Sequence, residues 1–437
     1  RIVRRQRVHP VRHLFCPQVR RKFQRLVDLA AGTLHGNAGL DLRLCGRGKP
    51  RHAAGKGLAG EDELDAQCRA LCQQVLQLQA IAFFLSGIGL TVCASFSETY
   101  ALKQVIAIAM GLAVYLIMTA LIRDVRVACW LRYPAAIGSL GVLAANLALA
   151  KVTNGTLNWI DLGFFSIQPS ELVKIAFVLV GAVSLEKLLS NTSLTKYIIF
   201  SITCVGSLFL MKDFGTALIF FFTFILIAFM RSGDVRTIAL ICTAALMGAV
   251  LVIYFKPYVA NRFAVYRHVW DFIDTTGYQQ TRVLIYSASG GLFGLGIGEG
   301  YLRDVYAAST DLVFGVICEE WGLVIGIAVL LSFAGIALFA VRAAKTAGST
   351  FYAIAAVAAA GMLLFQLSLN VFGITDILPL TGVTLPFVSR GGSSMLCSWG
   401  LLAYIRAAGA PFEPPKPDIA ISKVKRKAPA RAKEGAV

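Results

Sequence analysis

Long apolar segments separated by short polar ones follow one another along the chain from residue 76 onward. Most are roughly 17 to 25 residues long, the helix length that crosses a hydrocarbon core of about 30 Å. Backbone groups in lipid must be hydrogen-bonded within their own segment, so helices are expected and open strands are not. The ten predicted spans are residues 76–95, 101–122, 134–150, 169–187, 195–211, 214–231, 236–255, 312–341, 351–374 and 392–409.

The distribution of basic residues between the spans predicts an orientation. The loops at 96–100 and 375–391 contain one basic residue between them, Arg390. The stretch 256–311 is too long for its charge to indicate a side of the membrane. The positive-inside rule therefore predicts that both termini are cytoplasmic and that 256–311 is an external loop between the seventh and eighth spans. The basic residues of the predicted inner loops are Arg123, Arg126, Arg132, Lys187, Lys196, Arg231, Arg236, Arg342 and Lys345.

Composition supports an all-α integral membrane protein of about ten transmembrane helices. Of the 437 residues, 57% are hydrophobic and only 15% are charged, which argues against soluble domains, disorder and a disulfide-stapled secreted fold. The net charge is +18, and residues 1–75 supply half of it, with 15 basic and 6 acidic residues. Basic residues beside membrane spans are explained by orientation and by anionic membrane lipids, so no nucleic-acid partner is expected.

The chain divides into three predicted parts. Residues 1–75 form a basic leader without sustained apolar periodicity, residues 76–410 form the membrane domain, and residues 411–437 form a basic, disordered cytoplasmic tail. The first methionine is Met110, so the leader is expected to lie upstream of the native protein. Six cysteines within or at the edges of apolar spans are expected to be free thiols. They are Cys93, Cys129, Cys204, Cys242, Cys318 and Cys397.

Two short polar stretches stand before predicted spans. In the first, residues 154–174, Pro169 suits the first position of a helix and Lys174 lies inside the span. A lysine there either serves a site or extends its ammonium group to the membrane surface. The second is a two-charge hairpin, Lys212 and Asp213, in which Asp213 is expected to cap the next helix.

Two further polar stretches lie later in the chain. The external loop contains six glycines between residues 287 and 300 and ends at Asp311, which is either a helix cap or a functional acid. A nucleotide site is a weak interpretation, because no strand precedes these glycines and no P-loop lysine follows. Glu319 and Glu320 are expected to hold their helix through buried hydrogen bonds. Residues 379–394 contain prolines and glycines that prevent a regular helix, which implies a lined cavity.

Together these stretches resemble the SEDS family of bacterial cell-wall proteins, the RodA, FtsW and SpoVE group. The resemblance covers about residues 76–410. The matching motifs, in order, are N-G...W-I-D-L-G...Q-P-S-E-L-x-K at 154–174, D-F-G-T-A at 213–217, G-Y-Q and S-G-G-L-x-G-x-G-x-G at 277–298, T-D-L-V-F-G-V-I-x-E-E-x-G at 310–322, and L-P-L-T-G-V-T-L-P-F-V-S-x-G-G-S-S at 378–394.

The resemblance implies a peptidoglycan glycosyltransferase. Such an enzyme polymerises lipid II on the outer face of the cytoplasmic membrane beside a class B penicillin-binding transpeptidase, in elongation, division or sporulation. The family's essential aspartate matches Asp311. The sequence departs from the family pattern at Asn158, Ser166, Lys212 and Arg390, which suggests that the charges that bind the diphosphate have been redistributed.

The residues are compatible with an inverting displacement at a sugar. A sugar hydroxyl is a poor nucleophile, so a general base is needed, and the departing diphosphate needs cations. We expect Asp311 to be the base, with its pKa raised by desolvation. Lys174, Lys212 and Arg390 are the candidate diphosphate ligands, and a divalent cation, Mg or Mn, can share that task. No metal-ligating residues are assigned. The other predicted substrate-binding residues are Gln168, Glu171 and Ser393.

Two other classes of function remain open on the sequence. A flippase or transporter of a lipid-linked precursor would use the same polar cavity and broken helices. A non-catalytic scaffold for a transpeptidase would need no acid at Asp311. Polymerisation of lipid II by the purified protein and by an Asp311→Ala variant distinguishes these hypotheses.

Overall fold

A computed structural model describes residues 58–149, 160–161, 166–184, 191–233, 235–236, 239, 241–243 and 264–409. For residues 58–75 and 191–194 it describes the backbone alone. The predicted tail at 411–437, most of the predicted leader and most of the predicted seventh span lie outside the described residues. The six cysteines of the apolar spans are free thiols, as predicted.

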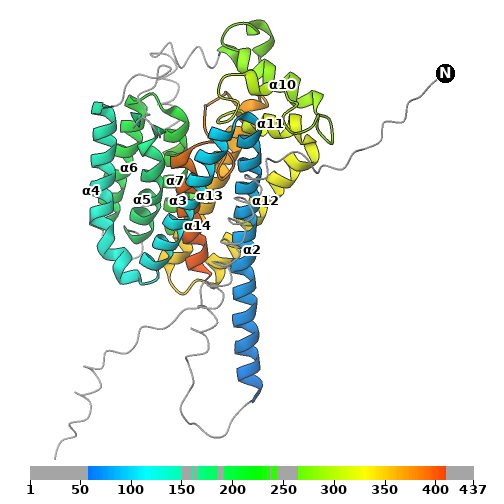
Figure 1. Ribbon diagram of the computed structural model, residues 1–437. Helices are drawn as coiled ribbons and strands as arrows, with labels where there is room; N and C mark the ends of the chain where they lie inside the picture. The colour runs from blue at the N-terminus through cyan, green and yellow to red at the C-terminus, as the bar shows by residue number, and fades with distance from the viewer. Residues whose placement is uncertain are drawn as a thin grey trace, which may run out of the picture.

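The all-α class is confirmed for the described residues (Figure 1). The first half of the chain contains α2 (Leu58–Phe96), α3 (Glu98–Leu121), α4 (Val125–Leu149), α5 (Pro169–Ser184), α6 (Asn191–Leu210) and α7 (Phe214–Ser232). The second half contains α10 (Tyr278–Ser289), α11 (Val313–Glu320), α12 (Gly322–Thr346), α13 (Thr350–Ile374) and α14 (Gly392–Ala408), with 3₁₀ turns η1 (Val269–Phe272) and η2 (Leu302–Asp304). Strands β1 (Ile160–Asp161) and β2 (Ser166–Ile167) form one antiparallel pair.

Six of the described helices are long and apolar enough to cross a membrane, which makes this a multi-pass membrane protein. They are Leu76–Phe96 of α2, then α3, α4, Phe214–Arg231 of α7, α12 and α13. The other predicted spans within the described residues fall on α5, α6 and α14, which are apolar but shorter or more polar. The total of ten spans stays a prediction.

Two predicted boundaries are wrong. The third span was expected from residue 134, but α4 begins at Val125 and contains Pro134. The sequence predicts one span over 312–341, but α11 ends at Glu320 and, after Trp321, α12 begins at Gly322, whose φ is +83°. A side chain at 322 would overlap the carbonyl group of Leu292, so only glycine suits this break.

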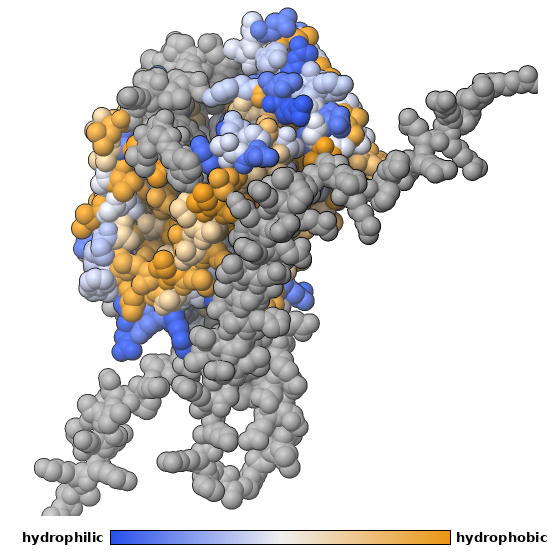
Figure 2. All heavy atoms as spheres, viewed as in Figure 1, coloured by the Kyte–Doolittle hydropathy of each residue, from blue (hydrophilic) through white to orange (hydrophobic). Residues whose placement is uncertain are grey.

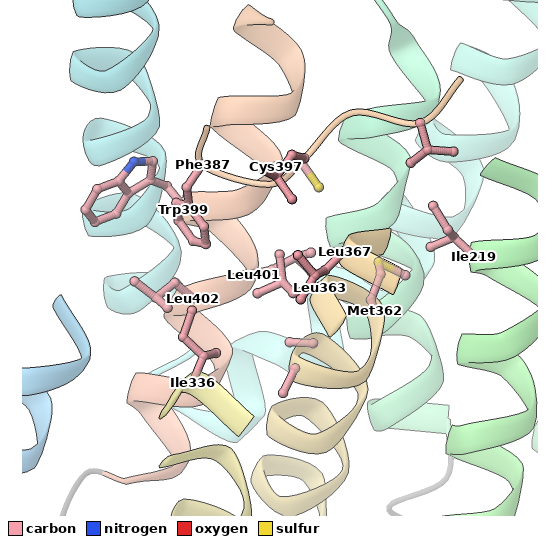
Figure 3. Close-up of a cluster of buried hydrophobic side chains, with 14 of the residues drawn as sticks. Ile219, Ile336, Met362, Leu363, Leu367, Phe387, Cys397, Trp399, Leu401 and Leu402 are labelled. Carbon is pink, nitrogen blue, oxygen red and sulfur yellow. The ribbon is translucent and has the colours of Figure 1, made fainter. Parts of the chain in front are cut away.

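Helix α14 lies in the middle of the molecule and packs against α3, α13, α5 and α12. Its Trp399 is fully buried, and the rings of Phe83, Tyr115 and Phe387 lie 4.9, 5.7 and 5.8 Å from it, centroid to centroid. Figure 3 shows Phe387 beside Trp399, and the aliphatic side chains of α13 and α14 meeting farther along. This packing fixes the N-terminal half of α14, which begins directly after the irregular residues 379–391.

The surface has the pattern expected of a protein in a bilayer. On the face seen in Figure 2, apolar side chains gather over the middle of the helices at the left, and polar ones gather at their lower ends and over the α10 region at the top. Trp130 and Ile137 of α4 are 75% and 72% exposed. Large apolar side chains exposed together over the middle of a helix bundle are typical of a surface in contact with lipid.

Candidate functional site

Asp311 is fixed by its backbone at the end of the external region. Its amide donates to the carbonyl of Ala307 at 3.0 Å, and its carbonyl accepts from Asn370 Nδ2 of α13 at 2.7 Å. Asn370 Nδ2 also donates to the carbonyl of Val383 at 2.7 Å. The N-cap position of α11 is occupied by Leu312, so the alternative that Asp311 caps this helix is wrong. The residue is half-buried.

The stretch 379–394 lies directly against Asp311. Its predicted irregular backbone is confirmed for residues 379–391, and helix α14 begins at Gly392. Gly382 has a φ of +71°, and a Cβ there would lie 3.3 Å from Asp311 Oδ2. Ser389 Oγ donates to the carbonyl of Thr310 at 2.5 Å, and the Arg390 amide donates to the carbonyl of Ser309 at 2.9 Å. Asp311 and this stretch therefore form one structural unit.

Arg390 brings a positive charge to this unit. Its guanidinium carbon lies 3.8 Å from the centre of the Tyr100 ring of α3, a cation–π contact that orients the group. The side chain is half-buried. Because the backbone of Arg390 is bonded to Ser309, two residues before Asp311, the cation and the carboxylate belong to neighbouring segments.

The hairpin between α6 and α7 borders the same stretch. Asp213 caps α7, as predicted, because its Oδ1 accepts from the Thr216 amide at 3.1 Å. Gly215 is so close to the 379–394 stretch that a Cβ there would overlap Val383 Cγ2 and lie 3.2 Å from the Thr381 carbonyl oxygen. Lys212, with a φ of +62°, is exposed at the tip of this hairpin.

The start of α5 joins the hairpin to α14. Pro169 is the first residue of the helix, as predicted. The Gln168 side chain donates to Asp213 Oδ2 at 2.9 Å, and the Gln168 amide donates to Ser393 Oγ at 3.3 Å. Gln168 is therefore in contact with Ser393, near the C-terminal end of the 379–394 stretch.

Lys174 and Glu171, on the first turns of α5, lie in the protein interior. Lys174 is fully buried, so the alternative of a lysine that reaches the membrane surface is wrong. Its Nζ contacts Glu171 Oε1 at 2.7 Å and Gln366 Oε1 at 2.9 Å. Gln366 Nε2 in turn donates to the carbonyl of Thr384 at 2.9 Å. Gln366 thereby connects the ion pair to the 379–394 stretch.

Glu319 stabilises the external region. The residue is fully buried, and its two carboxylate oxygens accept from the amides of Tyr301 and Leu302 at 2.7 and 3.0 Å. This confirms the predicted structural role for Glu319. Glu320 is also buried, but its carboxylate makes no hydrogen bond of good geometry to the described side chains.

Sequence reasoning missed Tyr100, Gln366 and Asn370, which orient the site from within apolar helices. The signal available was chemical: an amide inside an apolar span is costly unless it is hydrogen-bonded. Among the described residues, no group of three or more His, Cys, Asp or Glu side chains is arranged to hold a metal ion.

Fold and site together define a multi-pass membrane protein with a polar site built where several helices end on one side. The family model for FtsW, RodA and SpoVE cell cycle proteins matches residues 70–409. The chain therefore belongs to this family, which is the SEDS family indicated by its motifs.

Relatives agree with this assignment. Stage V sporulation protein E of Bacillus subtilis is 32% identical over 60% of this chain and 74% of its own length. The peptidoglycan glycosyltransferase RodA of Mycobacterium leprae is 30% identical over 70% of each chain. A probable peptidoglycan glycosyltransferase FtsW of Coxiella burnetii is 30% identical over 68% of this chain and 82% of its own.

Two solved structures are similar. One chain belongs to a peptidoglycan synthase complex that coordinates polymerization and crosslinking; its TM-score is 0.63, with 25% identity over 76% of this chain and 96% of that one. The other is the rod shape determining protein RodA of Thermus thermophilus, with a TM-score of 0.56 and 26% identity over 76% of this chain and 95% of that one.

Proposed function

We propose that this protein is a peptidoglycan glycosyltransferase that polymerises lipid II at the outer face of the bacterial cytoplasmic membrane. The observation that carries the proposal is the half-buried Asp311 carboxylate beside Gly382, on a segment bonded to that of Arg390. Relatives named as peptidoglycan glycosyltransferases support the reaction class.

In the proposed reaction Asp311 is the general base. It takes the proton of the acceptor sugar's 4-hydroxyl as that oxygen forms a bond to the anomeric carbon of the donor, and the bond from that carbon to the lipid diphosphate breaks. One carboxylate suffices, because an inverting displacement forms no glycosyl-enzyme intermediate. The fixed backbone of Asp311 supports this role, since general-base catalysis requires a positioned group.

We assign the diphosphate to Arg390 and Lys212, with Gln168 and Ser393 as polar contacts near them. Arg390 is oriented by Tyr100, and Lys212 is exposed at the neighbouring hairpin. Guanidinium and ammonium groups stabilise the charge that builds up on departing phosphate oxygens.

Lys174 and Glu171 are proposed to position the site and not to touch the substrate in this state. The ammonium group is fully buried and paired, so contact with a diphosphate would require the interior to open. The Lys174 ammonium group donates to Gln366, and Gln366 donates to the carbonyl of Thr384. These bonds support a role for Lys174 in fixing the 379–394 stretch.

In the proposed setting both termini lie in the cytoplasm, as the positive-inside rule predicts. We further propose that the prenyl chains lie among membrane lipids and that a class B penicillin-binding transpeptidase is the partner. The similar chain in a synthase complex that coordinates polymerization and crosslinking supports such a partner. A role in elongation, division or sporulation is consistent with RodA, FtsW and SpoVE relatives alike.

The test is polymerisation of lipid II by purified protein in vesicles, with and without the transpeptidase. Asp311→Asn should lower the rate by roughly 10²- to 10⁴-fold, the usual loss for a general base. Asp304→Asn is the matched control, because Asp304 is an exposed aspartate of the same external region. Normal polymerisation by Asp311→Asn would disprove the base. Precursor translocation without glycan synthesis by the unsubstituted protein would favour the flippase.

A further inference from the structure

The external segment 291–298, here called the apolar loop, exposes large side chains that the proposed reaction does not use. It contains no charged residue. Contiguous apolar surface of this kind marks contact with lipid or with another protein. The exposed side chains are Leu292 at 58%, Phe293 at 83%, Leu295 at 43% and Ile297 at 41%.

The backbone of the apolar loop is hydrogen-bonded to the break between α11 and α12. The amides of Leu295 and Gly296 donate to the carbonyls of Glu319 and Glu320 at 2.9 and 3.0 Å. The amides of Leu323 and Val324 donate to the carbonyls of Gly291 and Leu292 at 3.0 and 3.2 Å. Such groups at helix ends otherwise lack partners. Irregular backbone is tolerated at membrane depth only when protein satisfies it, and this break meets that condition.

Glycine makes this close pairing possible. Gly294 has a φ of +80°, and a Cβ there would overlap the carbonyl of Glu320. Gly296 and Gly298 also have positive φ, at +119° and +82°. In the sequence Leu-Phe-Gly-Leu-Gly-Ile-Gly, the glycine at 294 therefore faces the helix break, and the large side chains on either side are left on the surface.

The apolar loop continues the lipid-facing side of a membrane span. In Figure 1 the chain between α10 and α11 lies at the upper end of α12. The loop is bonded directly to the first turn of α12. The large exposed side chains in the first ten residues of this helix are also apolar: Leu323 at 45%, Val324 at 48%, Ile327 at 45% and Leu331 at 66%. Beyond the loop come exposed Tyr301, Arg303 and Asp304, the residue types of a membrane–water boundary.

We propose that the apolar loop is inserted into the bilayer leaflet on the side of α10 and α11, with Phe293 among phospholipid acyl chains. The insertion sets the depth of the external region, because Glu319 ties Tyr301 and Leu302 to the same helix break, and the chain runs from there to Asp311. The proposal does not depend on the identity of the reaction.

Photo-crosslinking of the full chain in phosphatidylglycerol and phosphatidylethanolamine vesicles tests this. Benzoylphenylalanine in place of Phe293 should form a phospholipid adduct, detected by mass spectrometry, to the same extent as at Leu331 on α12. The same group at Asp304 should give at least tenfold less. A lipid yield at 293 as low as that at 304, while 331 reacts, would overturn the proposal. So would a protein adduct that replaces the lipid adduct in native membranes.

A second variant guards against perturbation by the bulky probe. Phe293→Asp removes a side chain that packs little against the protein. If the loop lay in water, this change should therefore alter thermal stability little. In vesicles we expect a lower Tm than for Phe293→Leu, because a carboxylate in the acyl region is costly. Equal Tm values for the two variants would place Phe293 in water and contradict the insertion.

Discussion

At the scale of single residues, we expect the charge of Arg390, which lies beside the proposed base, to hold the diphosphate leaving group. Arg390 is stacked on Tyr100 and is bonded through its backbone to the segment of Asp311. Its replacement removes a cation without exposing a large apolar surface, since the side chain is only half-buried. The residue is therefore a favourable place to measure diphosphate binding.

We predict that Arg390→Ala lowers kcat/KM for lipid II polymerisation by roughly ten- to a hundredfold, the loss of about 1.5–3 kcal/mol typical of a charged hydrogen bond. Arg390→Lys should recover part of it. Arg267→Ala is the matched control, since Arg267 also lies over a tyrosine ring, 5.4 Å from the centre of Tyr266. Equal losses for both alanine variants would argue against the assignment.

Gly382 allows a sharper test of the geometry at Asp311. Gly382→Ala should cost about 1–2 kcal/mol of stability, because its φ is positive. It should also abolish most polymerisation, because the new methyl group crowds Asp311 Oδ2. Gly233→Ala has nearly the same φ, +61°, and open space around it, so it should lose similar stability and keep its activity. Polymerisation and thermal unfolding are measured for both. Full activity of Gly382→Ala would contradict this geometry.

At the scale of elements, the site depends on how irregular segments are attached to helices. Residues 379–391 contain no helix, and the 379–394 stretch is held by the Gln366 and Asn370 side chains of α13 and by the backbone amide of Gln168, directly before α5. The buried pair Lys174–Glu171 is the deepest of these attachments. A buried pair contributes little net stability, but leaving one partner alone is costly.

Single and double replacement of this pair should therefore differ. Lys174→Met alone should destabilise the protein by about 3–5 kcal/mol, because the Glu171 carboxylate is left buried without its cation. The double variant Lys174→Met, Glu171→Met should recover most of the lost stability, yet polymerise slowly, since Gln366 loses one of its partners. Thermal unfolding in detergent and lipid II polymerisation are the measurements. A double variant no more stable than Lys174→Met would show that the pair is not coupled as described.

At the scale of the whole molecule, the polar stretches gather at one end of the helix bundle. Asp311, Gln168 and the Lys212 hairpin all border residues 379–394, which include Arg390. The positive-inside rule predicts that this end lies on the external side of the membrane. The proposed polymerisation would then require substrate on the outer face.

This orientation predicts a clear labelling result. An epitope inserted after Asp274, which is exposed in the turn before α10, should bind antibody on intact spheroplasts. A tag after Val437 should bind antibody only after permeabilisation. Activity of the tagged protein is the control for correct insertion. The reverse pattern would place Asp311 on the cytoplasmic side and remove the proposed reaction from the outer face.

The sequence by itself determined the helical class, because apolar length and the cost of unbonded backbone in lipid leave few other structures. Local chemistry also predicted the Asp213 cap, the start of α5 at Pro169 and the irregular backbone of residues 379–394. The order of its motifs identified the family. These properties depend on residues that are neighbours in the chain.

Only the tertiary structure decided which distant residues meet. It buried Lys174 against Gln366, placed Asn370 between Asp311 and Val383, and laid Tyr100 under Arg390. It also divided the predicted eighth span at Gly322, because that residue packs against Leu292, thirty positions earlier. Periodicity along a chain reports which face of a helix is apolar, but contacts between helices depend on how those faces pack in three dimensions.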